Sequence, residues 1–275
     1  MKNTKEISYV RAQRERYKNV AFSNGPSSYR QASNYDLLYI LGDFRQKGIY
    51  HIADIACGSG LVGIEVAKRI RRNKGITRIT FIDIVPENLN KIRKGSNREI
   101  RLADLRNIRA KDSEFTHTYC RYAIKNMQFD DQIRSLKEIH RVTDRIFVLQ
   151  DMCSPQGLKE FQDKERWAKN MSAGDKVTKH NVPTDDGWKK MLEAVGFNIE
   201  KTEYRRYKVH TSEWVKSNQM KKENLKFYFD FIEKAKTKWP RSWTDYRIQK
   251  VGEGYEISYP VFFIKCKKPE TISRP

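Results

Sequence analysis

The stretch DIACGSGLVG, residues 54–63, constrains the fold of this chain more than any other feature. It joins an apolar run over residues 51–57 to an amphipathic segment over residues 61–75, through three glycines spaced as G-x-G-x-x-G. Because glycine has no side chain, such a backbone can turn sharply and approach a ligand closely. A strand, a glycine loop and a helix in this order predict a nucleotide-binding turn in a parallel sheet.

Strand and helix patterns alternate along the rest of the chain. We expect strands at 51–57, 78–84, 98–105, 114–124, 145–152, 198–209 and 255–268, and helices at 61–75, from Pro86, at 130–143 and at 186–197. The residues of the first helix expected to face the sheet are Leu61, Ile64, Ala67 and Ile70. The predicted fold is therefore α/β: a Rossmann-like, seven-stranded, mostly parallel sheet with the last strand antiparallel and helices on both faces.

Three segments do not fit this alternation. Residues 1–50 are expected to form an N-terminal helical cap on a domain over residues 51–275, and residues 154–182 and 211–243 are insertions, the second rich in aromatic side chains. Ligands bind outside the carboxyl ends of the strands in sheets of this type. If the sixth strand is parallel and the seventh antiparallel, the insertions form a lid over the substrate. Alternatively, the aromatic residues only pack the insertion against the body.

Composition limits the class of protein. No apolar run approaches the roughly 20 residues needed to cross a bilayer, and the first residues lack the apolar core of a signal peptide. Four cysteines lie far apart with no C-x-x-C pair, so neither a metal site nor a disulfide framework is expected, which fits a cytoplasmic protein. The net charge of +21 admits a nucleic-acid partner, although a solvated lysine-rich surface explains it as well.

Three acids indicate which cofactor the glycine loop binds. Asp83 ends the second strand, where a carboxylate accepts hydrogen bonds from ribose hydroxyls, as expected equally for NAD. Asp104 ends the third strand within reach of an adenine amino group, with Leu105 against the ring. Asp54 lies inside the first strand, where an anion is unfavourable beside a pyrophosphate but suits an ammonium or a sulfonium. S-adenosyl-L-methionine carries both cations, so it is the expected cofactor.

These residues resemble a family. The chain is similar to class I S-adenosylmethionine-dependent methyltransferases, in particular the ubiquinone/menaquinone C-methyltransferase-like (type 11) group. The resemblance rests on DIACGSG (54–60), FIDIVPENL (81–89), RLADL (101–105), CRYAIKNM (120–127), EIHRV (138–142), VLQDMCSP (148–155) and MLEAVGF (191–197). It covers about residues 50–200. One departure is the short connection TD before residue 145, where many relatives have a Pro-Gly-Gly turn.

The resemblance implies roles for particular positions. The backbone of residues 58–60 would lie against the methionine and ribose parts of the cofactor, and the backbone near Cys120 and Arg121 would meet the methionine amino group. The implied cofactor-binding residues are Asp54, Ala56, Gly58, Ser59, Gly60, Asp83, Ile84, Asp104, Leu105, Cys120 and Arg121.

The sequence contains no motif that identifies a catalytic residue. Methyl transfer is an in-line displacement, so the main task is to align the acceptor with the methyl group, and a base is needed only where the acceptor must lose a proton. His180 and His210 flank the insertions and are the candidates for such a base. Cys120 and Cys153 lack the residues that precede a nucleophilic cysteine in RNA cytosine methyltransferases, so packing is their expected role.

Three hypotheses about function follow. The favoured one is an enzyme that methylates a small organic acceptor, aromatic or hydrophobic, at an oxygen, nitrogen or carbon atom that the sequence leaves open. The second is an RNA methyltransferase, which the net charge motivates. The third is a cofactor-binding protein without catalysis, which is disfavoured because every cofactor position holds a competent residue. None of these patterns specifies the oligomeric state.

Overall fold

The computed structural model describes residues 49–72, 76–172, 181–217 and 220–269. The N-terminal helical cap expected at residues 1–50 lies almost wholly outside this part of the chain, and so does His180.

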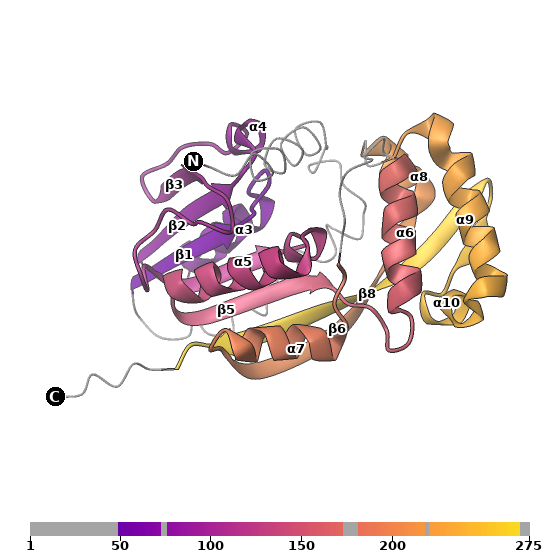
Figure 1. The fold of residues 1–275 in the computed structure, drawn as a ribbon. Coiled ribbons are helices and arrows are strands. Elements are labelled where there is room, and N and C mark those ends of the chain that lie inside the picture. Colours follow the sequence, from indigo (N-terminus) through magenta and orange to yellow (C-terminus); the bar gives the residue numbers. More distant parts are fainter. Residues whose placement is uncertain (1–48, 73–75, 173–180, 218–219, 270–275) are drawn as a thin grey trace, which may run out of the picture.

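The strands form a single twisted sheet in the order β3-β2-β1-β4-β5-β8-β6, with a short strand β7 paired to β8 (Figure 1). Their bounds are β1 Ile49–Ile55, β2 Ile76–Asp83, β3 Arg98–Leu102, β4 Phe115–Arg121, β5 Thr143–Met152, β6 Asn198–His210, β7 Gln249–Val251 and β8 Gly254–Lys267. The predicted α/β fold is confirmed, including the antiparallel last long strand.

The strand order reverses between β1 and β4. From β1 the chain runs outward through β2 and β3, then returns to place β4 on the other side of β1. Strands β1 to β5 are mutually parallel, so their carboxyl ends lie along one edge. A crevice at such a reversal is where sheets of this type bind ligands.

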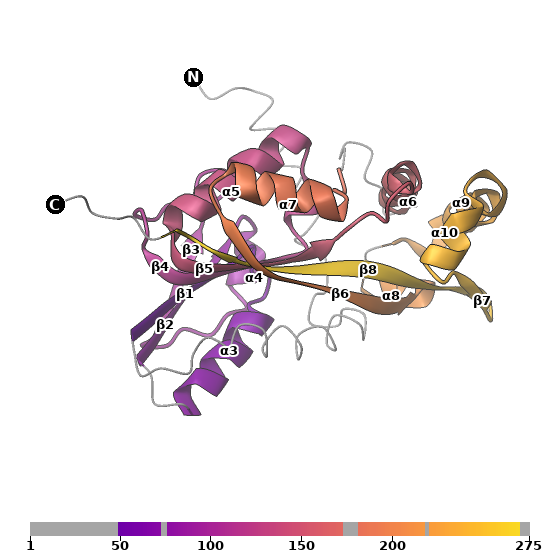
Figure 2. The ribbon, with the colours of Figure 1, turned by 90° about the horizontal axis from the view of Figure 1, so that it is seen from below.

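Helices cover both faces of the sheet (Figure 2). Helix α3 (Leu61–Arg72) lies on one face, and α5 (Phe129–Val142) and α7 (Asp185–Ala194) lie on the other. The apolar side chains that α5 and α7 bury fully are Leu136, Ile139, Val142, Trp188 and Leu192. Of the side chains expected on the inner face of α3, Ala67 is buried and Ile64 is half-buried against the core, whereas Leu61 is 42% exposed; Val62 and Val66 are also buried. Helix α4 begins at Pro86 as expected but ends at Leu89.

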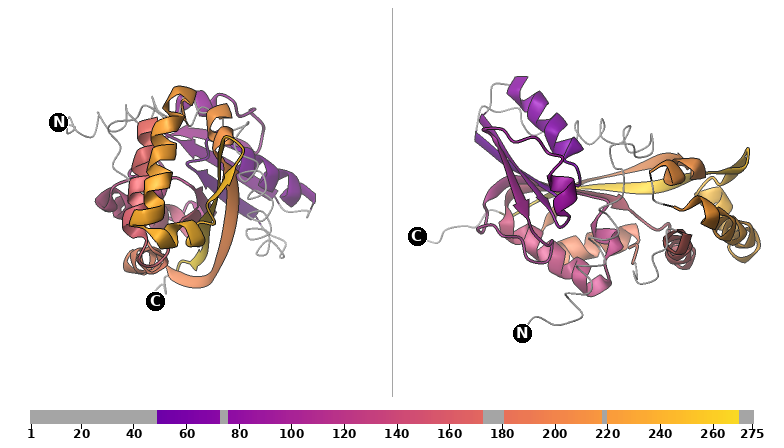
Figure 3. Two further views of the ribbon diagram at one scale, coloured as in Figure 1. Left: turned by 90° about the vertical axis from the view of Figure 1, so that its right-hand side faces the viewer. Right: turned by 90° about the horizontal axis from the view of Figure 1, so that it is seen from above.

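The two insertions fold into helices that pack on a long hairpin beyond the main sheet. Strand β5 ends opposite Val261, whereas the pairing of β6 with β8 continues as far as His210 and Glu256. On this extension lie α6 (Lys159–Ser172), α8 (Thr211–Lys216), α9 (Leu225–Lys238) and α10 (Pro240–Asp245), which with the hairpin ends we call the helical lobe. Figure 3 shows α6 and α9 side by side.

The direction of β6 decides where this lobe lies. Strand β8 is antiparallel to both β5 and β6, so β6 runs parallel to β5 and ends at the carboxyl edge of the sheet. The sixth long strand is therefore parallel and the seventh antiparallel, as the lid hypothesis requires. The connection from β6 to β8 starts beside the ligand crevice. Many of its aromatic side chains also pack the lobe internally, since Trp214, Tyr228 and Tyr246 are almost fully buried.

Candidate functional site

The glycine loop after β1 takes a backbone conformation that most side chains disfavour. Ala56, Gly58 and Gly60 have φ angles of 54°, 56° and 73°. A Cβ atom on Gly60 would lie 2.9 Å from Ile92 Cδ1 and 3.0 Å from Phe81 Cδ1, so packing as well as conformation requires glycine there. Ala56 is an alanine in the left-handed region, where such strain costs about 1–2 kcal/mol and is concentrated at functional sites.

Asp83 fixes the shape of this loop. Its Oδ2 accepts a hydrogen bond from the backbone N–H of Gly58 at 2.7 Å, and its Oδ1 accepts one from Val85 at 2.8 Å. Burial raises the pKa of Asp83, and these backbone bonds oppose the rise. Asp83, which the sequence predicts to bind the ribose, therefore also joins the loop after β1 to the end of β2 by hydrogen bonds.

Asp54 ties the same loop to helix α3. Its Oδ2 accepts a hydrogen bond at 2.9 Å from the backbone N–H of Gly63, in the first turn of the helix. A Cβ on Gly63 would lie 2.9 Å from that oxygen, so the third glycine serves close packing. Burial raises the pKa of Asp54 to about 7, and the nearby charge of Asp83 adds to the rise, while the Gly63 bond and the charge of Arg121 oppose it.

Asp104 is held in an ion pair. Its Oδ2 lies 2.7 Å from Arg106 Nη2, and its Oδ1 accepts hydrogen bonds from Arg106 Nε at 3.0 Å and from the Arg106 backbone N–H at 2.9 Å. Burial acts to raise the pKa of Asp104, but the Arg106 hydrogen bonds and charge bring it below its usual value. Arg106, two residues after Asp104, was not predicted from the sequence as a partner of this carboxylate.

The remaining predicted cofactor residues lie along the same edge. Ser59 is buried in the loop, and its hydroxyl has no hydrogen-bond partner among the described residues. Ile84 follows Asp83 and is half-buried, while Leu105 packs into the core. At the end of β4, the buried Cys120 is followed by the half-buried Arg121. Burial raises the pKa of the Cys120 thiol far above its usual range, so it is a poor nucleophile.

These features fit a cationic, adenosine-bearing cofactor. A buried hydroxyl without a partner, such as Ser59 Oγ, requires a ligand or a water to satisfy it. Asp54 and Asp83 lie close enough for the charge of one to raise the pKa of the other. Two neighbouring carboxylates would repel a pyrophosphate but attract an ammonium.

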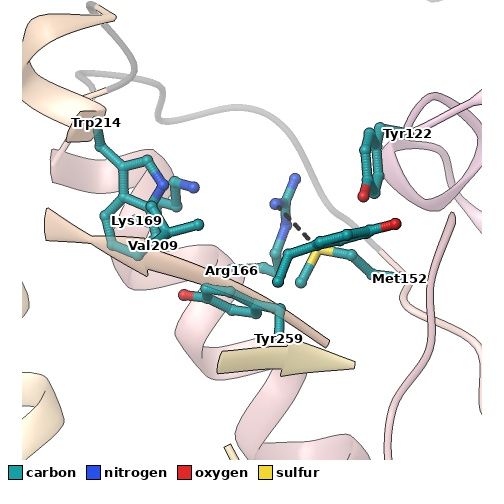
Figure 4. A pocket seen from close by; sticks show the side chains of 8 residues that line it. Tyr122, Met152, Arg166, Lys169, Val209, Trp214 and Tyr259 are labelled. Atoms are coloured by element: carbon teal, nitrogen blue, oxygen red, sulfur yellow. Dashed lines mark hydrogen bonds between the residues drawn. The ribbon is translucent and has the colours of Figure 1, made fainter. Parts of the chain in front are cut away.

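A pocket opens between the carboxyl ends of the strands and the helical lobe (Figure 4). The side chains that line it are Tyr122, Met152, Arg166, Lys169, Tyr207, Val209, Trp214 and Tyr259. The lining is thus mainly aromatic, with two cations contributed by α6.

A buried ion pair holds the turn that leads from β4 into this pocket. Lys125 Nζ lies 2.9 Å from Asp151 Oδ1 and donates to the Tyr122 carbonyl at 2.9 Å. Burial lowers the pKa of Lys125 to about 8, although the charge of Asp151 opposes this. Tyr122 itself has a φ of 52°, so a strained residue is fixed at the pocket mouth by the end of β5.

His210 occupies a structural position. Its Nε2 donates to the Val251 carbonyl at 3.1 Å, so its Nδ1 is the nitrogen that accepts from the Ser212 backbone N–H at 3.3 Å. The side chain thus caps helix α8 at the far end of the β6–β8 hairpin. Within the described ranges, no cluster of three metal-ligating side chains occurs, and no helix is both long and apolar enough to cross a membrane.

Part of the chain is similar to a known protein family, and most of its fold is similar to solved structures. Residues 52–145 match the family model described as a methyltransferase domain. A protein from Bacillus halodurans assigned as a methyltransferase superposes with a TM-score of 0.71 at 20% identity, covering 86% of this chain and 100% of that one. The YcgJ protein from Bacillus subtilis gives 0.71 at 15% identity, covering 86% and 99%.

A third similar structure contains the expected cofactor. It is magnesium protoporphyrin IX methyltransferase from Synechocystis with bound S-adenosylmethionine, with a TM-score of 0.50 at 11% identity, covering 88% of this chain and 81% of that one. At such identities these structures establish the fold. No curated protein matches the chain in sequence.

Proposed function

We propose that the chain transfers a methyl group from S-adenosylmethionine to a small aromatic or hydrophobic acceptor, because residues 52–145 match the model of a methyltransferase domain. The cofactor supplies an electrophilic methyl group on a sulfonium. The residues of the chain bind the cofactor, exclude water and align the acceptor with that methyl group.

The observation that carries this proposal is the position and lining of the pocket. Tyr122 follows directly on Cys120 and Arg121, the residues expected beside the methionine amino group, so the pocket lies next to the cofactor edge. Residues from both insertions contribute to its wall, namely Arg166 and Lys169 from the first and Trp214 from the second. This supports a role for residues 154–182 and 211–243 as a substrate lid.

The proposed cofactor contacts divide among the ends of four strands, β1 to β4. The backbone of residues 58–60 lies along the methionine and ribose, with Asp83 on the ribose hydroxyls. Asp104 and Leu105 frame the adenine, and the backbone near Arg121 meets the methionine amino group together with the Asp54 carboxylate. The Asp54 and Asp83 bonds to Gly63 and Gly58 support this arrangement, because they hold the loop in place before a ligand arrives.

The test is methyl transfer from radiolabelled S-adenosylmethionine to a panel of aromatic small molecules and to total RNA. We expect transfer to at least one small acceptor and none to RNA. Transfer to RNA, with binding that weakens steeply as salt is raised, would instead establish the macromolecular alternative. Binding of the cofactor without transfer to either class would support the non-catalytic alternative.

A further inference from the structure

We propose that the acceptor is an aromatic acid whose carboxylate pairs with Arg166 in the pocket. This inference rests on the proposed function, because it names the substrate class of the same site. Three observations carry it: the burial of Arg166, the absence of an anion beside it in the described chain, and the aromatic side chains around it.

Arg166 is a buried cation with neutral partners. The residue is 7% exposed and lines the pocket. Its Nη2 donates to Asn126 Oδ1 at 2.5 Å, its Nη1 lies 4.0 Å from Met152 Sδ, and its Nε has no hydrogen-bond partner among the described residues. A buried charge is costly unless it is paired, so this guanidinium needs an anion.

The neighbouring carboxylates are engaged elsewhere. Asp151 pairs with Lys125 at 2.9 Å. Glu165, the residue before Arg166 on α6, accepts hydrogen bonds at 2.6 Å from Tyr228 and from Tyr259. Within the described ranges, no carboxylate oxygen lies within 4 Å of the Arg166 guanidinium. The position is therefore complementary to a carboxylate brought by a ligand, which a guanidinium binds through two parallel hydrogen bonds.

The surrounding side chains favour an aromatic ligand. In the view of Figure 4, the Arg166 guanidinium stands between Tyr122 on one side and Lys169 with Trp214 on the other. Lys169 Nζ lies 3.8 Å from the centre of the Trp214 ring, so the indole is held in place by a cation. Rigid aromatic walls beside a guanidinium suit a flat ring that carries a negative group.

The test compares aromatic acids with their neutral amides. Benzoate, salicylate, cinnamate and indole acetate are titrated against the full chain saturated with S-adenosylhomocysteine, beside the matching amides, and binding is measured by ligand-observed NMR and calorimetry. We expect at least one acid to bind about tenfold to a hundredfold more tightly than its amide, as loss of a charge-assisted pair implies.

The variant Arg166→Met isolates the guanidinium. An apolar side chain of similar length is tolerated where a buried charge lacks an ionic partner, so thermal unfolding should show a folded protein. We expect the variant to bind acid and amide equally and to bind S-adenosylmethionine as the wild type does. Lys164→Met, which removes an exposed charge from the same helix, should leave the preference for the acid unchanged.

Three results would overturn the inference. The first is that no acid binds the wild type more tightly than its amide. The second is that Arg166→Met still prefers the acid. The third is that Arg166→Met binds the cofactor more weakly, which would place Arg166 on the carboxylate of the cofactor. Each of these leaves the methyltransferase proposal standing. Failure of the wild type to bind S-adenosylmethionine would instead contradict the proposed function. If Arg166→Met does not fold, the acid–amide comparison on the wild type decides alone.

Discussion

Replacing Asp54 by asparagine should move stability and cofactor binding in opposite directions. The Asp54 carboxylate is buried and accepts a hydrogen bond from the Gly63 backbone N–H. The carbonyl oxygen of an asparagine can accept the same bond. The substitution therefore removes the charge while it keeps the tie between β1 and α3.

The magnitude follows from the pKa of the group. Burial raises the pKa of Asp54 from 3.8 to about 7. Between these values the folded state binds more protons than the unfolded state, so this residue makes the protein less stable as pH rises through that window. The cost above pH 7 is at most about 4 kcal/mol, from about three pKa units at about 1.4 kcal/mol each. We expect Asp54→Asn to equal or exceed the wild type in stability there, with no difference near pH 4.

Cofactor binding should respond in the other direction. If Asp54 faces the ammonium of the methionine part, the neutral amide loses a charge-assisted contact, and affinity for S-adenosylmethionine should fall about tenfold or more. The assays are urea unfolding at about pH 4 and about pH 8, with calorimetric titration of the cofactor. Asp112→Asn is the control, since that side chain is 79% exposed and its loss should change stability by less than about 1 kcal/mol.

Binding of S-adenosylmethionine by Asp54→Asn as tightly as by the wild type would contradict a contact between this carboxylate and the cofactor. Asp54 would then serve only to hold the first turn of α3. A variant that is less stable than the wild type above pH 7 would contradict the assignment of a desolvation cost to the carboxylate.

Three further predictions concern the loop, the pocket mouth and the hairpin. Gly60→Ala should destabilise the protein by about 2–4 kcal/mol, from its left-handed φ and the contacts with Ile92 and Phe81, and should abolish cofactor binding in calorimetry. Lys125→Met leaves the Asp151 carboxylate buried and unpaired, so chemical denaturation should show a loss of about 3–5 kcal/mol. His210→Ala removes a helix cap, so it should cost about 0.5–2 kcal/mol while the rate of methyl transfer stays unchanged, and a large loss of rate at full folding would make His210 catalytic.

The parts of the fold that depend on local pattern were predictable from the sequence. Apolar runs of strand length, each followed by a helical period, are sufficient to specify a parallel sheet, and the G-x-G-x-x-G spacing locates the turn after β1. On α3, Ile64 and Ala67 were placed correctly, but Leu61 was predicted to be buried and is exposed, because Leu61 and Val62 are both apolar and only the contact with the sheet shows which one is buried. The acids at the strand ends were located, but their backbone partners Gly58 and Gly63 required coordinates.

The pocket lined by Tyr122, Arg166 and Trp214 could not be predicted from the sequence. Arg166 and Lys169 of α6 line it, on a buried polar face of that helix that also carries Gln162 and Glu165 at helical spacing. Such a polar stripe ordinarily indicates a face turned to water. Here it is buried because tyrosines reach Glu165 from positions 63 and 94 residues away in the sequence. Pairing over such separations leaves no periodic signal in the sequence itself.

The most direct test of the account is a calorimetric titration of the chain with S-adenosylmethionine and, separately, with NAD. We expect one molecule of S-adenosylmethionine to bind per chain and NAD not to bind. Asp54 and Asp83 place two carboxylates beside the loop where the pyrophosphate of NAD would lie, and these would repel it. Binding of NAD without binding of S-adenosylmethionine would contradict the central claim.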